Sequence, residues 1–128
     1  MSKLQESGEM YLETIYRLAQ KSPFVRSIDV ATEMNFSKPS ISRAMGILKD
    51  SGYITIERDG KIDLTDAGLA VAKRTFERHE VLTRVLTSLG VSPAVAEEDA
   101  CRMEHIISEE TFNAIKNHVK AEHDLNVN

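Results

Sequence analysis

The sequence predicts a mainly α-helical protein with a small β wing. Apolar residues recur every three or four positions along most of the chain, whereas only residues 53–64 alternate as strands do. The apolar fraction of 41% and the charged fraction of 28% are typical of a globular protein. A chain of 128 residues is expected to form at most one ordinary domain with a small appendage.

Two helices are expected in the first third of the chain. Apolar positions from about Ser7 to Gln20 follow helical spacing, and Pro23 prevents this helix from continuing. Ser27 is then expected to cap a short helix, because its hydroxyl can accept a hydrogen bond from an N–H of the first turn. Asn35 suits the left-handed conformation that closes a helix, so the short helix is expected to end there.

A further helix and a hairpin follow. Ser37 is expected to cap the helix, with Pro39 in its first turn, where the missing N–H costs nothing. Two short strands, residues 53–56 and 61–64, flank residues 58–60, whose Arg-Asp-Gly sequence is typical of a hairpin turn. The order helix, tight turn, helix, hairpin is that of a winged helix-turn-helix.

The second half is expected to contain three helices. Thr65 caps a long helix that Gly90 ends. Ser92-Pro93 opens another helix, which extends through about His105, and Ser108 caps the last one.

Charge is distributed unevenly along the chain. Residues 1–75 carry eleven Lys and Arg against ten Asp and Glu, a balance of +1, whereas residues 76–128 carry five against ten, a balance of −5. The two parts are therefore expected to face different partners. Every apolar run is too short to span a membrane, and Met1–Met10 lacks the apolar core of a signal peptide, so a cytoplasmic protein is expected.

The winged helix-turn-helix indicates DNA binding, because the second helix of this motif lies in the major groove. Arginine can read guanine or bind phosphate, and lysine and the hydroxyls add backbone contacts. An ordinary solvated helix face is the simpler alternative, but the hairpin that directly follows favours DNA. The candidate DNA-binding residues are Ser37, Lys38, Pro39, Ser40, Ser42, Arg43, Arg58 and Lys61.

A second group of residues is typical of a metal site. On a helix, Cys101 lies near Glu104 and His105, three and four positions later. Thiolate, carboxylate and imidazole together suit Fe(II), Co(II), Ni(II) or Zn(II) better than Mg(II) or Ca(II). The thioether of Met10 and the carboxylate of Glu13, one turn apart, are further candidate ligands.

Two more candidates and a simpler alternative accompany this group. His79 lies among apolar neighbours of the long helix, and Glu97 lies one turn before Cys101. Each residue alone has an ordinary explanation, since a lone cysteine, Met10 or His79 can be part of a packed core. Together they favour a metal.

Four segments resemble the diphtheria toxin repressor family of metal-dependent bacterial transcriptional regulators. They are Glu9–Tyr16, Phe36–Arg43, the Arg78-His79 pair and Asp99–His105, in the family's order. The resemblance implies a winged helix-turn-helix DNA-binding domain over residues 1–73 and a helical metal-binding and dimerisation domain over residues 74–128. It also implies a short form, since longer members continue into a third, SH3-like barrel domain.

The resemblance implies a ligand set that mixes two branches of the family. Met10, Cys101, Glu104 and His105 match the primary site of the iron-responsive branch. Glu13 matches a carboxylate ligand of the manganese-responsive branch. His79 matches a histidine used in both.

Two positions depart from the iron branch. Glu97 stands where that branch has an ancillary histidine, and Thr83 where it has a glutamate. An ancillary site is therefore either absent or rebuilt by Glu13, Glu80 and Glu97.

The sequence thus predicts a homodimeric repressor of metal-homeostasis genes that Fe(II) or Mn(II) activates and that binds palindromic operator DNA. Co(II), Ni(II) or Zn(II) are plausible surrogates. One alternative is a winged-helix regulator that responds to an organic ligand or to oxidation of Cys101. The other is a small metalloenzyme with Cys101 as nucleophile and His105 as base, but no orienting group is visible, so a non-enzyme is expected.

Overall fold

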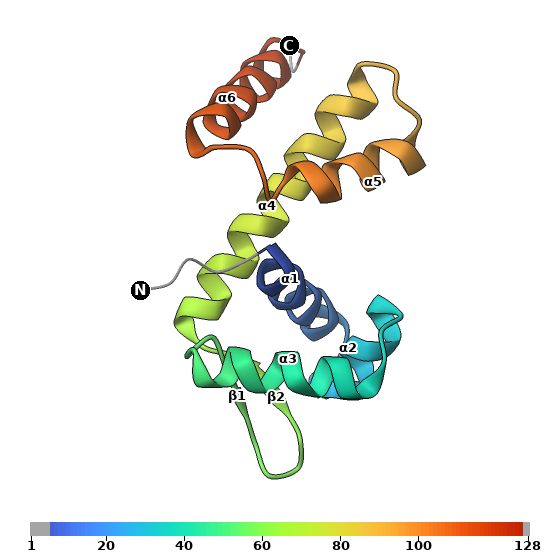
Figure 1. Ribbon diagram of the computed structural model, residues 1–128. Coiled ribbons are helices and arrows are strands. Elements are labelled where there is room, and N and C mark those ends of the chain that lie inside the picture. Colours follow the sequence, from blue (N-terminus) through green and yellow to red (C-terminus); the bar gives the residue numbers. More distant parts are fainter. Residues whose placement is uncertain (1–5, 127–128) are drawn as a thin grey trace. The chain divides into compact units, whose positions relative to one another are not determined.

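The computed structural model describes the backbone of residues 6–126 and the side chains of residues 6–121. It confirms a mainly helical protein with one two-stranded sheet (Figure 1). The chain forms two compact units, residues 1–74 and 75–128. None of the described helices is long and apolar enough to cross a membrane. The elements are α1 (Glu6–Lys21), α2 (Ser27–Met34), α3 (Lys38–Asp50), β1 (Ile54–Ile56), β2 (Ile62–Leu64), α4 (Asp66–Ser88), α5 (Pro93–Met103) and α6 (Glu109–Asn126).

The start of α2 corrects one expectation about capping. Ser27 is the first residue of the helix rather than its cap, and Arg26 occupies the cap position in an extended conformation. The carboxylate of Asp29 explains the shift, because its Oδ2 accepts a 2.8 Å hydrogen bond from the N–H of Arg26. The other end agrees with the prediction: Asn35 adopts the left-handed conformation, with φ 58° and ψ 43°.

The cap of α3 and the wing confirm their predictions in most respects. The Ser37 hydroxyl accepts a hydrogen bond from the N–H of Ser40, and Pro39 lies in the first turn. β1 and β2 pair antiparallel, with Ile54 opposite Leu64, although each strand has three residues rather than four. The paired strands follow α3, and β1 packs against that helix (Figure 1).

The first unit has an aliphatic core to which α1, α2, α3, the wing and the start of α4 contribute. Burying these side chains is the main stabilising term of the unit. The residues with at most 4% exposure are Leu12, Ile15, Val25, Val30, Ala31, Ile41, Met45, Leu48, Ile54, Ile62 and Ala72.

The start of α4 is fixed by its contact with the segment between α3 and β1. Thr65 caps α4 by accepting a hydrogen bond from the N–H of Gly68, and its hydroxyl donates to the carbonyl of Gly52. Gly68 approaches Tyr53 so closely that an added methyl group would overlap the Tyr53 carbonyl oxygen. Residue 68 must therefore be glycine for the helix to pack here.

The second unit contains the C-terminal part of α4 together with α5 and α6. Its buried apolar residues include Leu82, Ala96, Ala100 and Phe112. As predicted, α5 begins at Pro93, but it ends at Met103 rather than near His105. The chain then turns, with the N–H groups of residues 106 and 107 both donating to the carbonyl of Met103.

Candidate metal centre and nucleic-acid interface

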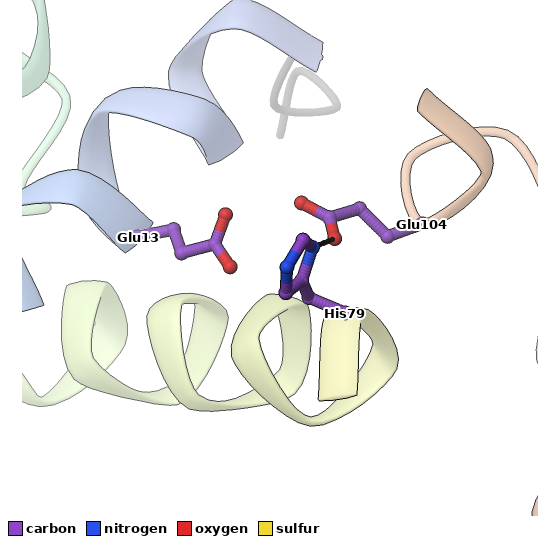
Figure 2. A group of neighbouring side chains, drawn as sticks. All are labelled: Glu13, His79 and Glu104. Carbon is purple, nitrogen blue, oxygen red and sulfur yellow. Dashed lines mark hydrogen bonds and ion pairs between the residues drawn. The ribbon is translucent and has the colours of Figure 1, made fainter. Parts of the chain in front are cut away.

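A cluster of ligand-type side chains in the second unit surrounds Glu104. This residue is only 1% exposed. Its Oε2 lies 2.9 Å from Nδ1 of His79 on α4, and its Oε1 lies 3.3 Å from Nε2 of His105. Figure 2 shows the His79 ring and the Glu104 carboxylate pointing toward one another. One buried carboxylate therefore lies between two imidazoles.

The second ring nitrogen of His79 faces another acidic residue. Nε2 lies 3.8 Å from Oε1 of Glu97 on α5, and the Glu97 side chain is 64% exposed. The His79 ring thus lies between a buried carboxylate and one that faces solvent. Cys101, one turn after Glu97 on the same helix, is partly buried.

The candidate ligands Cys101, Glu104 and His105 lie on both sides of the end of α5, which is at Met103. Cys101 lies in the last turn of the helix, whereas Glu104 is its C-terminal cap and His105 lies in the following turn. Glu104 keeps helical backbone angles, with φ −61° and ψ −23°, and its N–H donates to the carbonyl of Ala100, four residues earlier. The turn directs Glu104 toward a histidine that precedes it by 25 residues.

Arg78 makes several buried contacts in the second unit, and sequence reasoning assigned it no role. Its guanidinium is buried and donates to the backbone carbonyls of Glu104, at 3.1 Å, and Ile107, at 2.9 Å. It also pairs with the Glu109 carboxylate at 2.7 Å and lies over the ring of Phe112. The signal in the sequence was the Arg78-His79 pair, one of the four segments that resemble the family. Its partners lie 26 to 31 residues further along the chain.

The donor set of this cluster fits a divalent transition metal. Imidazole nitrogen and carboxylate oxygen are ligands that Mn(II), Fe(II), Co(II) and Zn(II) all accept, and the thiol of Cys101 would add a soft donor. Burial of a carboxylate is costly unless positive charge or hydrogen bonds compensate it. A bound cation would supply that charge at Glu104.

The first unit carries the other two predicted ligands, Met10 and Glu13, both on α1. Met10 is partly buried, whereas Glu13 is 6% exposed and forms an ion pair with Arg17, its Oε2 lying 3.1 Å from Nη2 of Arg17. Figure 2 labels Glu13 on α1 as well. The i, i+3 spacing places both side chains on one side of the helix.

Two residues considered for an ancillary site differ in their surroundings. Glu80 is exposed on α4. Thr83, on the same helix, has a buried hydroxyl without a hydrogen-bond partner among the described residues. A hydroxyl is a weaker donor to a divalent metal than a carboxylate.

The predicted DNA-binding residues gather on α3 and the wing. Those at the start and along one side of α3 are all exposed: Ser37, Lys38, Pro39, Ser40, Ser42 and Arg43. The Ser37 and Ser40 hydroxyls bond to each other at 2.8 Å as part of the helix cap. On the wing, Arg58 is exposed and Lys61 lies 3.7 Å from the Asp63 carboxylate.

The beginning of α2 adds two residues that sequence reasoning did not include. Ser27 and Ile28 line a shallow pocket together with Lys38 and Ser42 of α3. The Ile28 side chain is 42% exposed. The sequence alone does not show that Ile28 of α2 lies beside exposed residues of α3.

Two family models match successive parts of the chain. The model described as "Iron dependent repressor, N-terminal DNA binding domain" matches residues 3–62. The model described as "Iron dependent repressor, metal binding and dimerisation domain" matches residues 65–123. Together they account for nearly all of the sequence.

Individual relatives agree with these matches. The chain is 34% identical over 106 residues to the transcriptional regulator MntR of Escherichia coli O6:H1. The match covers 83% of this chain and 68% of MntR. It is 28% identical over 111 residues to the diphtheria toxin repressor of Corynebacterium diphtheriae. That match covers 86% of this chain and 49% of the repressor.

A solved structure shows that the fold is shared as well. A protein described as a manganese-dependent transcriptional repressor in complex with manganese superposes with a TM-score of 0.80 and 24% identity. The match covers 88% of this chain and 52% of that one. The predicted resemblance is therefore confirmed: the chain belongs to the iron-dependent repressor family, whose members are DNA-binding transcriptional regulators and not enzymes.

Proposed function

We propose that this protein is a homodimeric transcriptional repressor that binds palindromic operator DNA when Fe(II) or Mn(II) is bound, and that it acts in the cytoplasm on metal-homeostasis genes. The observation that carries the proposal is the buried carboxylate of Glu104 between His79 and His105. It lies in the unit matched by a metal-binding family model, and exposed basic residues lie on α3 in the unit matched by a DNA-binding one.

The proposed metal ligands come from both units. Glu104, His79 and His105 form the centre, and Glu97 and Cys101 are within the same unit. The first unit supplies two more, Met10 and Glu13. We include them because a thioether and a carboxylate extend the donor set and because the resemblance assigns both.

Ligands on two units give the metal a way to control DNA binding. A bound divalent cation supplies positive charge to a group of carboxylates that otherwise repel one another. Only a conformation that brings both sets of side chains together satisfies all of them, so that conformation is favoured. A nearly complete switch needs on the order of 5 kcal/mol of differential affinity, which several ligands together can provide.

The choice between the two metals depends on ligand softness. The sulfur atoms of Met10 and Cys101 favour Fe(II), whereas the additional carboxylate of Glu13 favours Mn(II). One relative with a solved structure is described as manganese-dependent. We therefore expect both ions to activate the protein.

On the DNA side, α3 is proposed to enter the major groove. Arg43 is its best candidate for reading a base, since arginine can donate two hydrogen bonds to guanine. Lys38, Arg58 and Lys61 are proposed to bind phosphates. Two subunits would present two such helices to the halves of a palindrome.

The proposal is tested by DNA binding at controlled metal concentration. An operator is first selected from random DNA in the presence of Mn(II), and its affinity is then measured by fluorescence anisotropy with Mn(II), with anaerobic Fe(II) and with chelator. Affinity should rise at least about tenfold with either metal. The Glu104→Gln variant should lose this rise, whereas Glu98→Gln, which alters an exposed residue paired with Arg102, should keep it.

Equal affinity with metal and with chelator would contradict the proposal. A response to oxidant that Cys101→Ser abolishes would then favour the alternative regulator.

A further inference from the structure

We propose that Arg78 is a positioning residue for the metal centre, which holds Glu104 opposite His79. The inference rests on the proposed function, because it assigns Arg78 a role toward the same ligands. It concerns only residues of the second unit.

The contacts of Arg78 converge on the turn between α5 and α6. Nη1 donates to the carbonyl oxygens of Glu104 and Ile107, at 3.1 and 2.9 Å. Nη2 donates to Oε1 of Glu109 at 2.7 Å. One side chain thus binds the beginning of the turn at Glu104, its later part at Ile107 and the start of α6 at Glu109.

The chemistry of the turn explains why a guanidinium is needed. The last carbonyl groups of a helix have no partner within it, and Glu104 is the C-terminal cap of α5. The rigid planar guanidinium carries several N–H donors and can bind the Glu104 carbonyl and, further along the turn, the Ile107 carbonyl at once. An ammonium group is a compact charge on a flexible stem and cannot reproduce this geometry.

The ion pair with Glu109 contributes less than the carbonyl contacts. The Arg78 side chain is 9% exposed, whereas that of Glu109 is 66% exposed. Solvent therefore screens the attraction between their charges. The buried hydrogen bonds to the backbone are the contacts that fix the turn, supported by the ring of Phe112 at 5.2 Å.

The position of Arg78 links two ligands through one helix. His79 follows Arg78 directly on α4, so the same helical turn sets the imidazole and, through the carbonyl of Glu104, the opposing carboxylate. Releasing that carbonyl would let the carboxylate move away from Nδ1 of His79. Metal affinity should then fall even though every ligand is present.

The test compares Arg78→Gln and Arg78→Lys with Arg84→Gln, a matched change at an exposed arginine of the same helix. Co(II) is titrated into each metal-free protein, and the visible d–d absorption reports both affinity and coordination. Circular dichroism at the same temperature confirms that each variant is folded. Arg78→Gln should bind Co(II) at least about tenfold more weakly and with altered bands, as is usual when a group supporting a ligand is lost.

The remaining variants separate positioning from general stability. Arg78→Lys should fall between Arg78→Gln and the unmodified protein, Arg84→Gln should match the unmodified protein, and Glu109→Gln should lose less than Arg78→Gln. Folded Arg78→Gln with unchanged affinity and bands would overturn the inference. If Arg78→Gln does not fold, Arg78→Lys decides, and unmodified affinity and bands in that variant would overturn it. Failure of the unmodified protein to bind Co(II) would instead contradict the proposed function.

Discussion

At the scale of single residues, the buried polar groups carry most of the functional information. Glu104 and His79 are buried, and Oε2 of Glu104 lies 2.9 Å from Nδ1 of His79. A charged group is kept in such a place only when partners compensate it. Exposed charges such as those of Arg102 and Glu98, which pair along one face of α5, impose no comparable requirement.

The softness of the ligands leads to a prediction about metal selectivity. Cys101→Asp should shift activation from iron toward manganese, because it replaces a soft thiolate with a carboxylate while Glu104 and His105 remain. Met10→Asp combined with Cys101→Glu should shift it in the same direction. The measurement is operator affinity against Mn(II) and anaerobic Fe(II), with thermal melting as the control. A stable variant whose ratio of activating concentrations does not move would mean that the substituted sulfur residues are not ligands.

The exposed guanidinium of Arg43 leads to a prediction about DNA. Arg43→Ala should weaken specific binding by roughly 1–3 kcal/mol, the value of a lost base contact. Metal affinity and the dimer should not change, because Arg43 is exposed and is not among the proposed metal ligands. Gel-shift titration at fixed salt gives the comparison, and Arg102→Ala on α5 serves as the control. Operator affinity equal to that of the control would remove Arg43 from the interface.

At the scale of elements, local signals located most helix starts correctly. Ser37, Thr65 and Ser108 each accept a hydrogen bond from an N–H three residues later. These bonds involve neighbours in the chain, so the sequence is sufficient to predict them. The end of α5 could not be predicted in this way, because the carbonyl of its C-terminal cap, Glu104, is bound by Arg78 on another helix.

Close packing between the start of α4 and the segment that joins α3 to β1 leads to a stability prediction. Gly68→Ala should lower the free energy of unfolding by about 1–3 kcal/mol, because its methyl group would overlap the Tyr53 carbonyl. Gly46→Ala, within α3, meets no atom within 4 Å and should raise stability by about 0.5–1 kcal/mol. Urea denaturation without DNA measures both. A Gly68→Ala variant as stable as Gly46→Ala would show that the backbone yields at no cost.

At the scale of the whole molecule, the second unit leaves large apolar side chains uncovered. Leu89 is 75% exposed, Ile106 is 73% exposed and Val95 is 47% exposed. Phe112, in contrast, is buried within the unit. Exposed apolar groups of this size are typical of an interface.

From the exposed apolar side chains of Leu89, Val95 and Ile106 we predict a dimer that forms without metal. The metal-free protein should sediment at twice 14.3 kDa at micromolar concentration. Ile106→Glu should shift the equilibrium toward the monomer, because a carboxylate would have to be buried in the interface. Analytical ultracentrifugation distinguishes the two species, and Ile47→Glu, which alters an exposed apolar residue of the first unit, is the control. A monomer in the unmodified protein would contradict the prediction.

The sequence by itself determined the class of fold, the order of the elements, most of their caps, the family and the chemical types of the candidate ligands. These features depend on periodicity and on contacts between residues a few positions apart. Only the tertiary structure decided that Glu104 lies between His79 and His105 and that α5 ends at Met103, before both Glu104 and His105. It also decided that Arg78 binds the turn that follows α5. The physical reason is that these contacts join α4 to residues 25 to 31 positions later, where packing rather than chain proximity sets the distance.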